Sequence, residues 1–356
     1  MQKNSVNIAI KYVKKGKVKD AEKVLRPAVR FLMKKKCKKI ILGCTELPIA
    51  IFAYKSFKRA KDSKLFIDPN LLLAQVCMKN YKKYLFLKLK QRVKKNLIII
   101  FSDLDGTILH KRNFKFDKIK KYIKKLISHK IILVPNTSKT ELEIKDFIKE
   151  LGIKLPFICE NGSAIYNLNL INSKLPKKII LSRDIKNILE ILNEIPYKFR
   201  KKIVDLRKID KKKQLKIFGL PGNKINAALK RKFTIPIIFN GNINEKRKFH
   251  TQIKKLGLTI QYGGRISNLG DKVDKSKAIN LFLKLVKSKI KDPIKTIGVG
   301  DNHNDINMLK NTDFPCLVFN QNFKTTNLNI KKLIISSKPS PQGWADVIKK
   351  AVLKIK

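Results

Sequence analysis

Short apolar runs alternate with longer segments of helical period along this chain of 356 residues. Apolar runs of four to six residues between polar turns are typical of buried strands, whereas long amphipathic segments are typical of helices. The alternation predicts an α/β fold in which the turns after parallel strands lie at one edge of the sheet, where ligands bind. The clearest predicted strands cover residues 39–42, 97–101, 131–134, 156–159 and 296–299.

Two carboxylates, Asp103 and Asp105, follow the predicted strand at residues 97–101. Side chains two positions apart in an extended chain point to the same side, so we expect both at the end of this strand. Gly106 comes next and permits a tight turn. Only 26 of the 356 residues are acidic, so this pair is a specific signal.

The segment SDLDGT, residues 102–107, resembles the first motif of the haloacid dehalogenase phosphatases. The resemblance implies a Rossmann-like parallel sheet core. It also implies that Asp103 attacks phosphorus to form an aspartyl-phosphate, which splits one difficult displacement into two. Asp105 would protonate the leaving alkoxide and later activate water.

Two further segments resemble the next motifs of this superfamily, in the same order. In PNTSKT, residues 135–140, the resemblance implies that Thr137 hydrogen-bonds the transferring phosphoryl group. In DKVDKSKA, residues 271–278, it implies that Lys275 neutralises both Asp103 and the phosphate. A helix cap and a solvated lysine are the alternative interpretations of these two residues.

The segment GVGDNHND, residues 298–305, resembles the fourth motif and implies a Mg²⁺ site. Hard divalent cations prefer oxygen ligands, which carboxylates and amides supply. For one hydrated ion to bridge them, Asp103 and Asp301 must lie within about 10 Å of each other. The residues that the resemblance places at the metal are Asp103, Asp105, Asp301, Asn304 and Asp305.

About residues 96–354 resemble the mannosyl-3-phosphoglycerate phosphatases, through NTSKTELEI, LPFICENGSAIY, YGGRISNLG and a late GW pair. The resemblance implies a small phosphorylated sugar as substrate and mannosylglycerate, a compatible solute, as product. Glucosyl-3-phosphoglycerate or another sugar phosphate stays open as the substrate. Two of the residues implied in substrate binding, Arg231 and Arg265, are equally well explained as surface cations. The residues implied in substrate binding are Ser138, Lys139, Glu160, Asn161, Gly162, Arg231 and Arg265.

The regular alternation weakens over residues 167–262, which we predict to form an α/β cap inserted into the core. The core would then comprise residues 97–166 and 263–356. A basic stretch, residues 89–96, is predicted as a linker to an N-terminal segment, residues 1–88.

The N-terminal segment carries Cys44, Thr45 and Glu46 in a GCTE motif that resembles the C-terminal third of aspartate/glutamate racemases. Such racemases use a second cysteine from a half that has no counterpart here, so racemisation by this chain alone is not expected. A remnant or docking module is favoured. A split enzyme completed by a separate racemase fragment, and a bifunctional fusion, stay open.

The chain has 82 Lys and Arg against 26 Asp and Glu, a net charge of +56. These cations are spread along the sequence without a nucleic-acid-binding motif, which favours a solvated basic surface over a nucleic-acid partner. Five cysteines without a CxxC pair indicate neither a disulfide framework nor a zinc site. With no signal peptide and no apolar run of about 20 residues, we expect a soluble cytoplasmic protein without a membrane partner.

Overall fold

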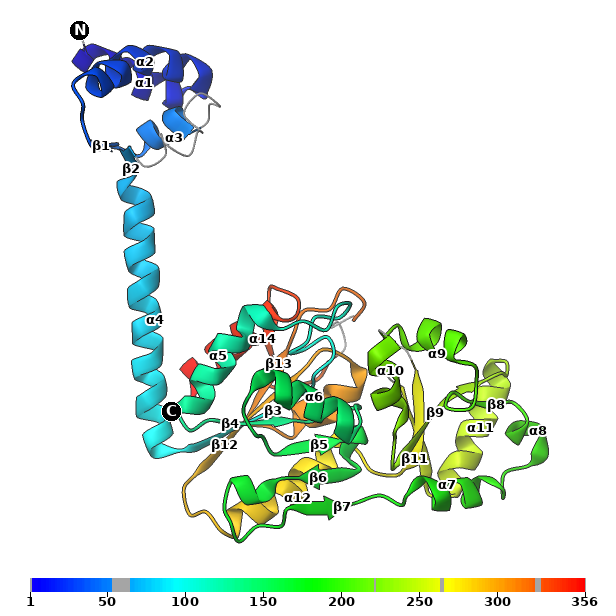
Figure 1. Ribbon diagram of the computed structural model, residues 1–356. Helices are drawn as coiled ribbons and strands as arrows, with labels where there is room; N and C mark the ends of the chain where they lie inside the picture. The colour runs from blue at the N-terminus through cyan, green and yellow to red at the C-terminus, as the bar shows by residue number, and fades with distance from the viewer. Residues whose placement is uncertain (1, 53–64, 221, 263–265, 324–327, 356) are drawn as a thin grey trace. The chain divides into compact units, whose positions relative to one another are not determined.

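The computed structural model describes residues 2–52, 65–220, 222–262, 266–323 and 328–355 (Figure 1). By its internal contacts the chain divides into two compact units, Met1–Leu87 and Lys88–Lys356. Each unit is described by itself below. None of the described helices combines the length and apolar character needed to cross a membrane.

Helices α1, α2 and α3 of the N-terminal unit contact one another, and two short strands of the unit pair in parallel. Its core includes Ala21, Leu25 and Ile51, all buried. The elements are α1 Gln2–Lys14, α2 Val18–Lys34, β1 Ile40–Ile41, α3 Glu46–Phe52 and β2 Phe66–Ile67.

The stretch predicted as a linker, residues 89–96, is helical up to Lys95. Helix α4 runs without a break over Pro69–Lys95. The stretch KLKQRVKK has no glycine or proline and consists mainly of good helix formers, so its local preference agrees with the helix.

Five parallel strands form the main sheet of the second unit, in the order β14-β13-β12-β3-β4. Strand β3 lies between β12 and β4, and its last residue, Ser102, is paired with Val299 of β12 and with Pro135 of β4. Asp103 and Asp301, the first residues after β3 and β12, therefore start from the same edge. The strands are β3 Leu97–Ser102, β4 Ile132–Pro135, β12 Ile294–Gly300, β13 Phe314–Leu317 and β14 Ile334–Ile335.

Helices cover both faces of this sheet (Figure 1). Helices α5 and α14 lie on one face and contact each other, while α12 and α13 belong to the other. The parallel α/β core predicted from the alternating pattern is thereby confirmed. The bounds are α5 Asp117–Ser128, α6 Glu141–Leu151, α12 Lys275–Lys287, α13 Ile306–Lys310 and α14 Gln342–Lys354.

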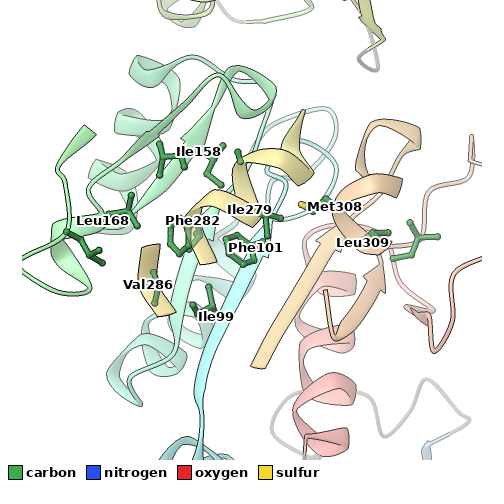
Figure 2. Close-up of a cluster of buried hydrophobic side chains, with 14 of the residues drawn as sticks. Ile99, Phe101, Ile158, Leu168, Ile279, Phe282, Val286, Met308 and Leu309 are labelled. Atoms are coloured by element: carbon green, nitrogen blue, oxygen red, sulfur yellow. The ribbon is translucent and has the colours of Figure 1, made fainter. Parts of the chain in front are cut away.

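Alternate side chains of β3 enter the two layers. Ile99 and Phe101 pack with Ile279 and Phe282 of α12 (Figure 2). Ser102, on the opposite face, accepts a hydrogen bond at 3.0 Å from the indole of Trp344 in α14. Full burial of each large apolar side chain stabilises a fold by roughly 1.5–3 kcal/mol, so these layers fix β3 in place.

The prediction for residues 156–159 is only partly right. Strand β5, Phe157–Cys159, exists, but only a short 3-10 turn, η2 Glu160–Gly162, follows it in place of an α-helix. Strand β6, Ala164–Tyr166, then pairs back antiparallel with β5 and pairs with β7, Lys178–Ile180. Positive φ angles at Glu160 (45°), Asn161 (59°) and Gly162 (99°) reverse the chain here. Non-glycine residues adopt such angles rarely, so the sequence pattern did not reveal this turn.

The cap contains an antiparallel sheet in the order β10-β11-β9-β8. Helices α7 and α11 supply apolar side chains to the same cluster as β9, β10 and β11, and α9 and α10 form a second cluster. The elements are α7 Ile185–Leu192, α8 Tyr197–Arg200, β8 Ile203–Asp205, α9 Lys211–Phe218, α10 Gly222–Leu229, β9 Thr234–Phe239, α11 Ile243–Lys255, β10 Leu258–Tyr262 and β11 Ser267–Asp271.

Both predicted cap boundaries, residues 167 and 262, need correction. Leu168 and Leu175 pack in the main core, and β7 joins the core's three-stranded sheet, so the cap begins later. At the other end, β11 pairs with β9 and β10, so the cap sheet continues to Asp271. The short, partly polar sequence SNLGD of β11 gave no strand signal by itself.

Candidate active site

A buried lysine joins two carboxylates at the carboxyl edge of the main sheet. Lys275 Nζ donates hydrogen bonds to Asp103 Oδ1 and Asp305 Oδ1, both at 2.7 Å. Lys275 is only 2% exposed. Although desolvation opposes its charge, the negative charges of Asp103 and Asp305 raise the pKa of Lys275 above its ordinary value. The lysine therefore carries the positive charge that buried carboxylates need.

Asp305 stabilises the conformation of the loop after β12. Its Oδ2 accepts hydrogen bonds from the backbone N–H of Asp301 at 3.0 Å and of Asn302 at 3.2 Å. A Cβ at Gly300 would lie 2.3 Å from the Cβ of Asp305, so only glycine permits this close approach. Both Asp305 oxygens thus have protein donors, and the residue positions Asp301 and Lys275.

Three carboxylates form a group that fits a divalent cation. One oxygen from each of Asp103, Asp301 and Asp305 lies within 4.8 Å of the others, well inside the distance that one hydrated ion bridges. Desolvation, followed by the charges of Asp305 and Asp103, raises the pKa of Asp301 well above its ordinary value. Asp103 and Asp301 also line a cavity, so a hard cation bound there would relieve this repulsion.

The loop after β3 closely approaches the carboxylate of Asp301. Thr107 Oγ1 donates to Asp301 Oδ1 at 3.2 Å, and Asn320 Nδ2 donates to Asp301 Oδ2 at 2.9 Å. Gly106 has a φ of 77°, and a Cβ there would lie 2.6 Å from Asp301 Oδ2. These contacts fix the direction of the Asp301 carboxylate.

Asp105 is not part of this carboxylate group and pairs with a different lysine, Lys139. Its Oδ2 lies 2.9 Å from Lys139 Nζ, which in turn lies 3.0 Å from Glu143. The Asp105 side chain is partly exposed, but its Oδ1 is buried and has no hydrogen-bond partner among the described residues, and Lys139 is buried as well. Desolvation raises the pKa of Asp105 despite the opposing charge of Lys139. A carboxylic acid with a raised pKa is suited to donate a proton.

A cavity of about 230 Å³ joins these groups to the cap. Asp103, Asp105, Lys139 and Asp301 form its core side. The cap side combines one arginine and one amide with apolar side chains. Its residues are Phe218, Leu220, Ala228, Arg231, Ile266 and Asn268.

The profile of the haloacid dehalogenase-like hydrolase family matches residues 100–348, which contain this whole cavity. The chain belongs to the haloacid dehalogenase-like hydrolase family. Hydrolases of this family generally use Mg²⁺. The N-terminal unit lies outside the matched residues.

Two relatives named glucosyl-3-phosphoglycerate/mannosyl-3-phosphoglycerate phosphatase match this haloacid dehalogenase-like hydrolase over 260 residues each. The protein from Persephonella marina is 31% identical and the one from Methanococcoides burtonii 28% identical. Each match covers 70% of this chain, with 96% and 95% of the respective relative. The family and these relatives identify the chain as a phosphoric monoester hydrolase.

Solved structures share the fold. A protein from Thermoplasma acidophilum has a TM-score of 0.53 at 16% identity, covering 72% of this chain and 99% of that chain. A haloalkanoate-superfamily phosphatase from Bacteroides thetaiotaomicron has a TM-score of 0.52 at 16% identity, covering 72% and 95%. At this identity the likeness concerns the fold alone.

Three of the predicted substrate-binding residues of this hydrolase line the cavity: Ser138, Lys139 and Arg231. Arg231 Nη1 donates to the carbonyl of Ser138 at 3.2 Å and to Thr234 Oγ1 at 2.8 Å, so it bridges cap and core. Arg265 lies outside the described residues.

Glu160, which is predicted to bind substrate, is not among the residues that line this cavity. Its buried carboxylate accepts hydrogen bonds from the backbone N–H groups of Lys232, Phe233 and Thr234, and from the Thr234 hydroxyl. These hydrogen bonds join the core to the cap.

Three other predicted residues also lie beside the cavity rather than in its wall. Asn161 borders a second cavity next to Lys275. A Cβ at Gly162 would lie 2.2 Å from the carbonyl oxygen of Asp274, so this glycine lets the turn reach the start of α12. Thr137 is fully buried, and its hydroxyl accepts a long bond of 3.4 Å from the Lys139 N–H.

Sequence reasoning did not single out several residues of the site, among them Thr107, Glu143, Asn268 and Asn320. A signal was present for Glu143, because Thr140 and Glu143 have the spacing of a capping box, and α6 begins with one. Asn304, a predicted ligand, lines the cavity beside Asp301. The contacts of Thr107, Asn268 and Asn320 depend on segments that come together only in the folded chain.

In the N-terminal unit, Cys44 follows β1 and is half-buried. Thr45 Oγ1 donates to Glu46 Oε2 at 2.9 Å, and this bond lowers the pKa of Glu46. Cys37 packs at the edge of the unit's apolar core.

Proposed function

We propose that this hydrolase converts mannosyl-3-phosphoglycerate to mannosylglycerate and phosphate, with Mg²⁺ and an aspartyl-phosphate on Asp103. The observation that carries the proposal is the contact of Lys275 with both Asp103 and Asp305, next to Asp301. Attack by a carboxylate on a phosphate monoester brings like charges together, so the site needs fixed positive charge.

The first half of the reaction forms a bond between an Asp103 carboxylate oxygen and phosphorus, while the bond from phosphorus to the glycerate oxygen breaks. Asp105 gives its proton to that oxygen as it leaves. Lys275 holds Asp103 in place and offsets negative charge in the transition state. Thr137 is proposed to donate a hydrogen bond to the phosphoryl group.

The second half releases the enzyme. Asp105, now a carboxylate, takes a proton from water, whose oxygen attacks phosphorus while the bond to Asp103 breaks. The neighbouring Lys139 stabilises the charged form of Asp105, and desolvation stabilises its neutral form. The residue can therefore exist in either state during the cycle.

We propose that Asp103 and Asp301 hold Mg²⁺, that Asn304 is a further ligand, and that Asp305 supports them; oxygens of the three aspartates lie within 4.8 Å of one another, and Asn304 lines the same cavity. Mg²⁺, when bound, would supply positive charge that offsets the negative charge of the phosphoryl group. We propose no direct ligation by the Asp105 carboxylate, because it pairs with Lys139.

The cavity offers a suitable place for the rest of the substrate. Lys111, Lys139 and Arg231 supply positive charge for the glycerate carboxylate, and Phe218 and Leu220 form an apolar wall for a sugar face. Arg265 stays a proposed contact of the carboxylate. The names of the two phosphatases from Persephonella marina and Methanococcoides burtonii support both glucosyl and mannosyl substrates.

A phosphate-release screen tests the substrate. Purified protein with Mg²⁺ is assayed on mannosyl- and glucosyl-3-phosphoglycerate, on 3-phosphoglycerate and on common sugar phosphates. We expect kcat/KM for a glycosyl-3-phosphoglycerate to exceed that for simple sugar phosphates by at least about tenfold. Preference for a simple sugar phosphate would reject this substrate while leaving the phosphatase assignment.

For the N-terminal unit we propose no activity of its own. The likeness to racemases rests on the segments KKIILGCTELPIAI and LFIDPNLLLAQ, and a bifunctional fusion stays the second candidate. Deuterium uptake at the α-carbon of L-aspartate, measured in D₂O with and without a separate racemase fragment, tests it. Uptake with the purified chain alone would favour the fusion.

A further inference from the structure

The two faces of the cap sheet differ in chemistry. Leu269 of β11 pairs with Ile235 and Ile260, and all three belong to the apolar cluster shared with α7 and α11. Asn268, one position earlier, lies on the opposite face because successive side chains of a strand alternate. This second face is directed at the cavity, which Asn268 lines together with Asp105 and Arg231.

The side chain of Asn268 is buried with an unused acceptor. It is 2% exposed, and no donor among the described residues reaches its carbonyl oxygen Oδ1. Buried polar atoms are nearly always hydrogen-bonded, so an orphaned one in a cavity wall indicates that a bound molecule or water supplies the partner. A purely structural wall position would take an apolar residue such as its neighbour Ile266.

The chemistry of this acceptor selects one group of the substrate. An amide oxygen accepts hydrogen bonds and cannot donate them. The phosphoryl and carboxylate groups of a phosphoglycerate ester are also acceptors when ionised, so neither is a partner for Oδ1. Hydroxyl groups are the donors that such a molecule offers, and the sugar part carries several.

We propose that Asn268 is a specificity-determining residue whose Oδ1 accepts a hydrogen bond from a sugar hydroxyl of the substrate. The inference rests on the proposed function and adds a residue of the cap to it. The nearby Arg231, whose buried Nε also has no partner among the described residues, supplies a donor for an anionic group of the same molecule. Asn268 would thus accept a hydrogen bond from a hydroxyl group, and Arg231 would donate one to an anionic group.

A site that hydrogen-bonds a substrate hydroxyl discriminates against analogues that lack it, because its own buried group is then left unpaired. The measured quantity is the selectivity ratio, kcat/KM for the glycosyl-3-phosphoglycerate divided by kcat/KM for p-nitrophenyl phosphate, which has no hydroxyl. Asn268→Leu removes the acceptor at similar length, whereas Asn268→Ser keeps a hydroxyl and leaves room for water.

We expect Asn268→Leu to lower the selectivity ratio at least about tenfold and Asn268→Ser to lower it no more than about threefold. An unchanged ratio in a folded Leu variant, or an equal loss in both variants, would overturn the proposal. The thermal unfolding midpoint of each variant reports folding.

A second measurement does not depend on the Leu variant folding. Glycosyl-3-phosphoglycerates that each lack one sugar hydroxyl are compared in the wild type and in Asn268→Ser. One of them should lose about tenfold in kcat/KM with the wild type. Equal turnover of all of them with the wild type would overturn the proposal.

Failure of the proposed function would look different. In that case the wild type hydrolyses no glycosyl-3-phosphoglycerate better than p-nitrophenyl phosphate, and the ratio is measured with the best hydroxylated ester of the screen. A fall of that ratio in Asn268→Leu would still support the role of Asn268, and an unchanged one would overturn it.

Discussion

Glu160 of the core accepts two hydrogen bonds from Thr234 of the cap, through Oε2 from the backbone N–H at 2.9 Å and from the hydroxyl at 2.7 Å. The same Thr234 hydroxyl accepts from Arg231, which lines the cavity. A carboxylate that is 1% exposed thus fixes the part of the cap that carries a substrate-facing cation.

Glu160→Gln should loosen this attachment. The amide loses one acceptor oxygen and turns a donor toward backbone N–H groups, so we expect a loss of about 2–4 kcal/mol in the free energy of unfolding. Urea unfolding measures it. Glu190→Gln, an exposed change on α7, is the matched control. Equal unfolding curves for the two variants would contradict the role of Glu160.

Lys275→Met should abolish phosphate release. Without the lysine, Asp103 and Asp305 are two buried carboxylates whose shared cation is gone, and we expect kcat to fall about 10³-fold or more. Lys277→Met, two positions along the same helix and exposed, provides the control and should keep most activity. A similar kcat in both variants would show that the position of Lys275 is unimportant.

Gly106→Ala should reduce activity by displacing Asp301. The new Cβ would lie 2.6 Å from Asp301 Oδ2, at a φ of 77°. Gly152→Ala separates this effect from backbone strain, because Gly152 has a φ of 78° and its nearest neighbour would be 3.5 Å away. Both changes should cost about 1 kcal/mol of stability, but only Gly106→Ala should lower kcat about tenfold or more. Equal kinetics for the two would contradict the account.

Mg²⁺ should stabilise the protein, and more so at pH 7.5 than at pH 5. Desolvation, with the charges of Asp305 and Asp103, raises the pKa of Asp301 in the folded state. Above the ordinary pKa of an aspartate, the folded protein without metal therefore binds more protons at Asp301 than the unfolded chain does, and this contribution to stability is lost as the pH rises. A cation removes that penalty, and saturation at 100 times Kd adds about 2.7 kcal/mol.

The measurement is the thermal unfolding midpoint with and without Mg²⁺ at the two pH values. Asp301→Asn is the control, since it should raise the metal-free midpoint at pH 7.5 and lose most of the gain from Mg²⁺. An equal gain from Mg²⁺ in this variant would exclude Asp301 as a ligand.

The sequence predicted the parallel core because the motifs follow apolar strands, and the carboxyl ends of parallel strands meet at one edge. Asp103 and Asp301 come together for this reason, although 197 positions in the chain separate them. The prediction needed only strand order and the direction of the chain.

Contacts that depend on unusual backbone or on distant pairs were not predictable in this way. The positive φ angles of Glu160 and Asn161 reverse the chain so that β6 pairs antiparallel with β5. Neither position is a glycine, so the sequence gives no signal for these angles. Likewise Asn268 faces the cavity only because β11 pairs with β9 and β10. Its role depends on a tertiary register that local sequence does not contain.

The most direct test is phosphate release by the Asp103→Asn variant, assayed with Mg²⁺ on the best substrate of the screen beside the wild type and Asp117→Asn, an exposed change at the start of α5. The amide keeps the shape of Asp103 but is not a nucleophile, so we expect a loss of about 10³-fold or more, with the thermal unfolding midpoint near that of the wild type. Turnover equal to that of Asp117→Asn would show that Asp103 does not attack phosphorus.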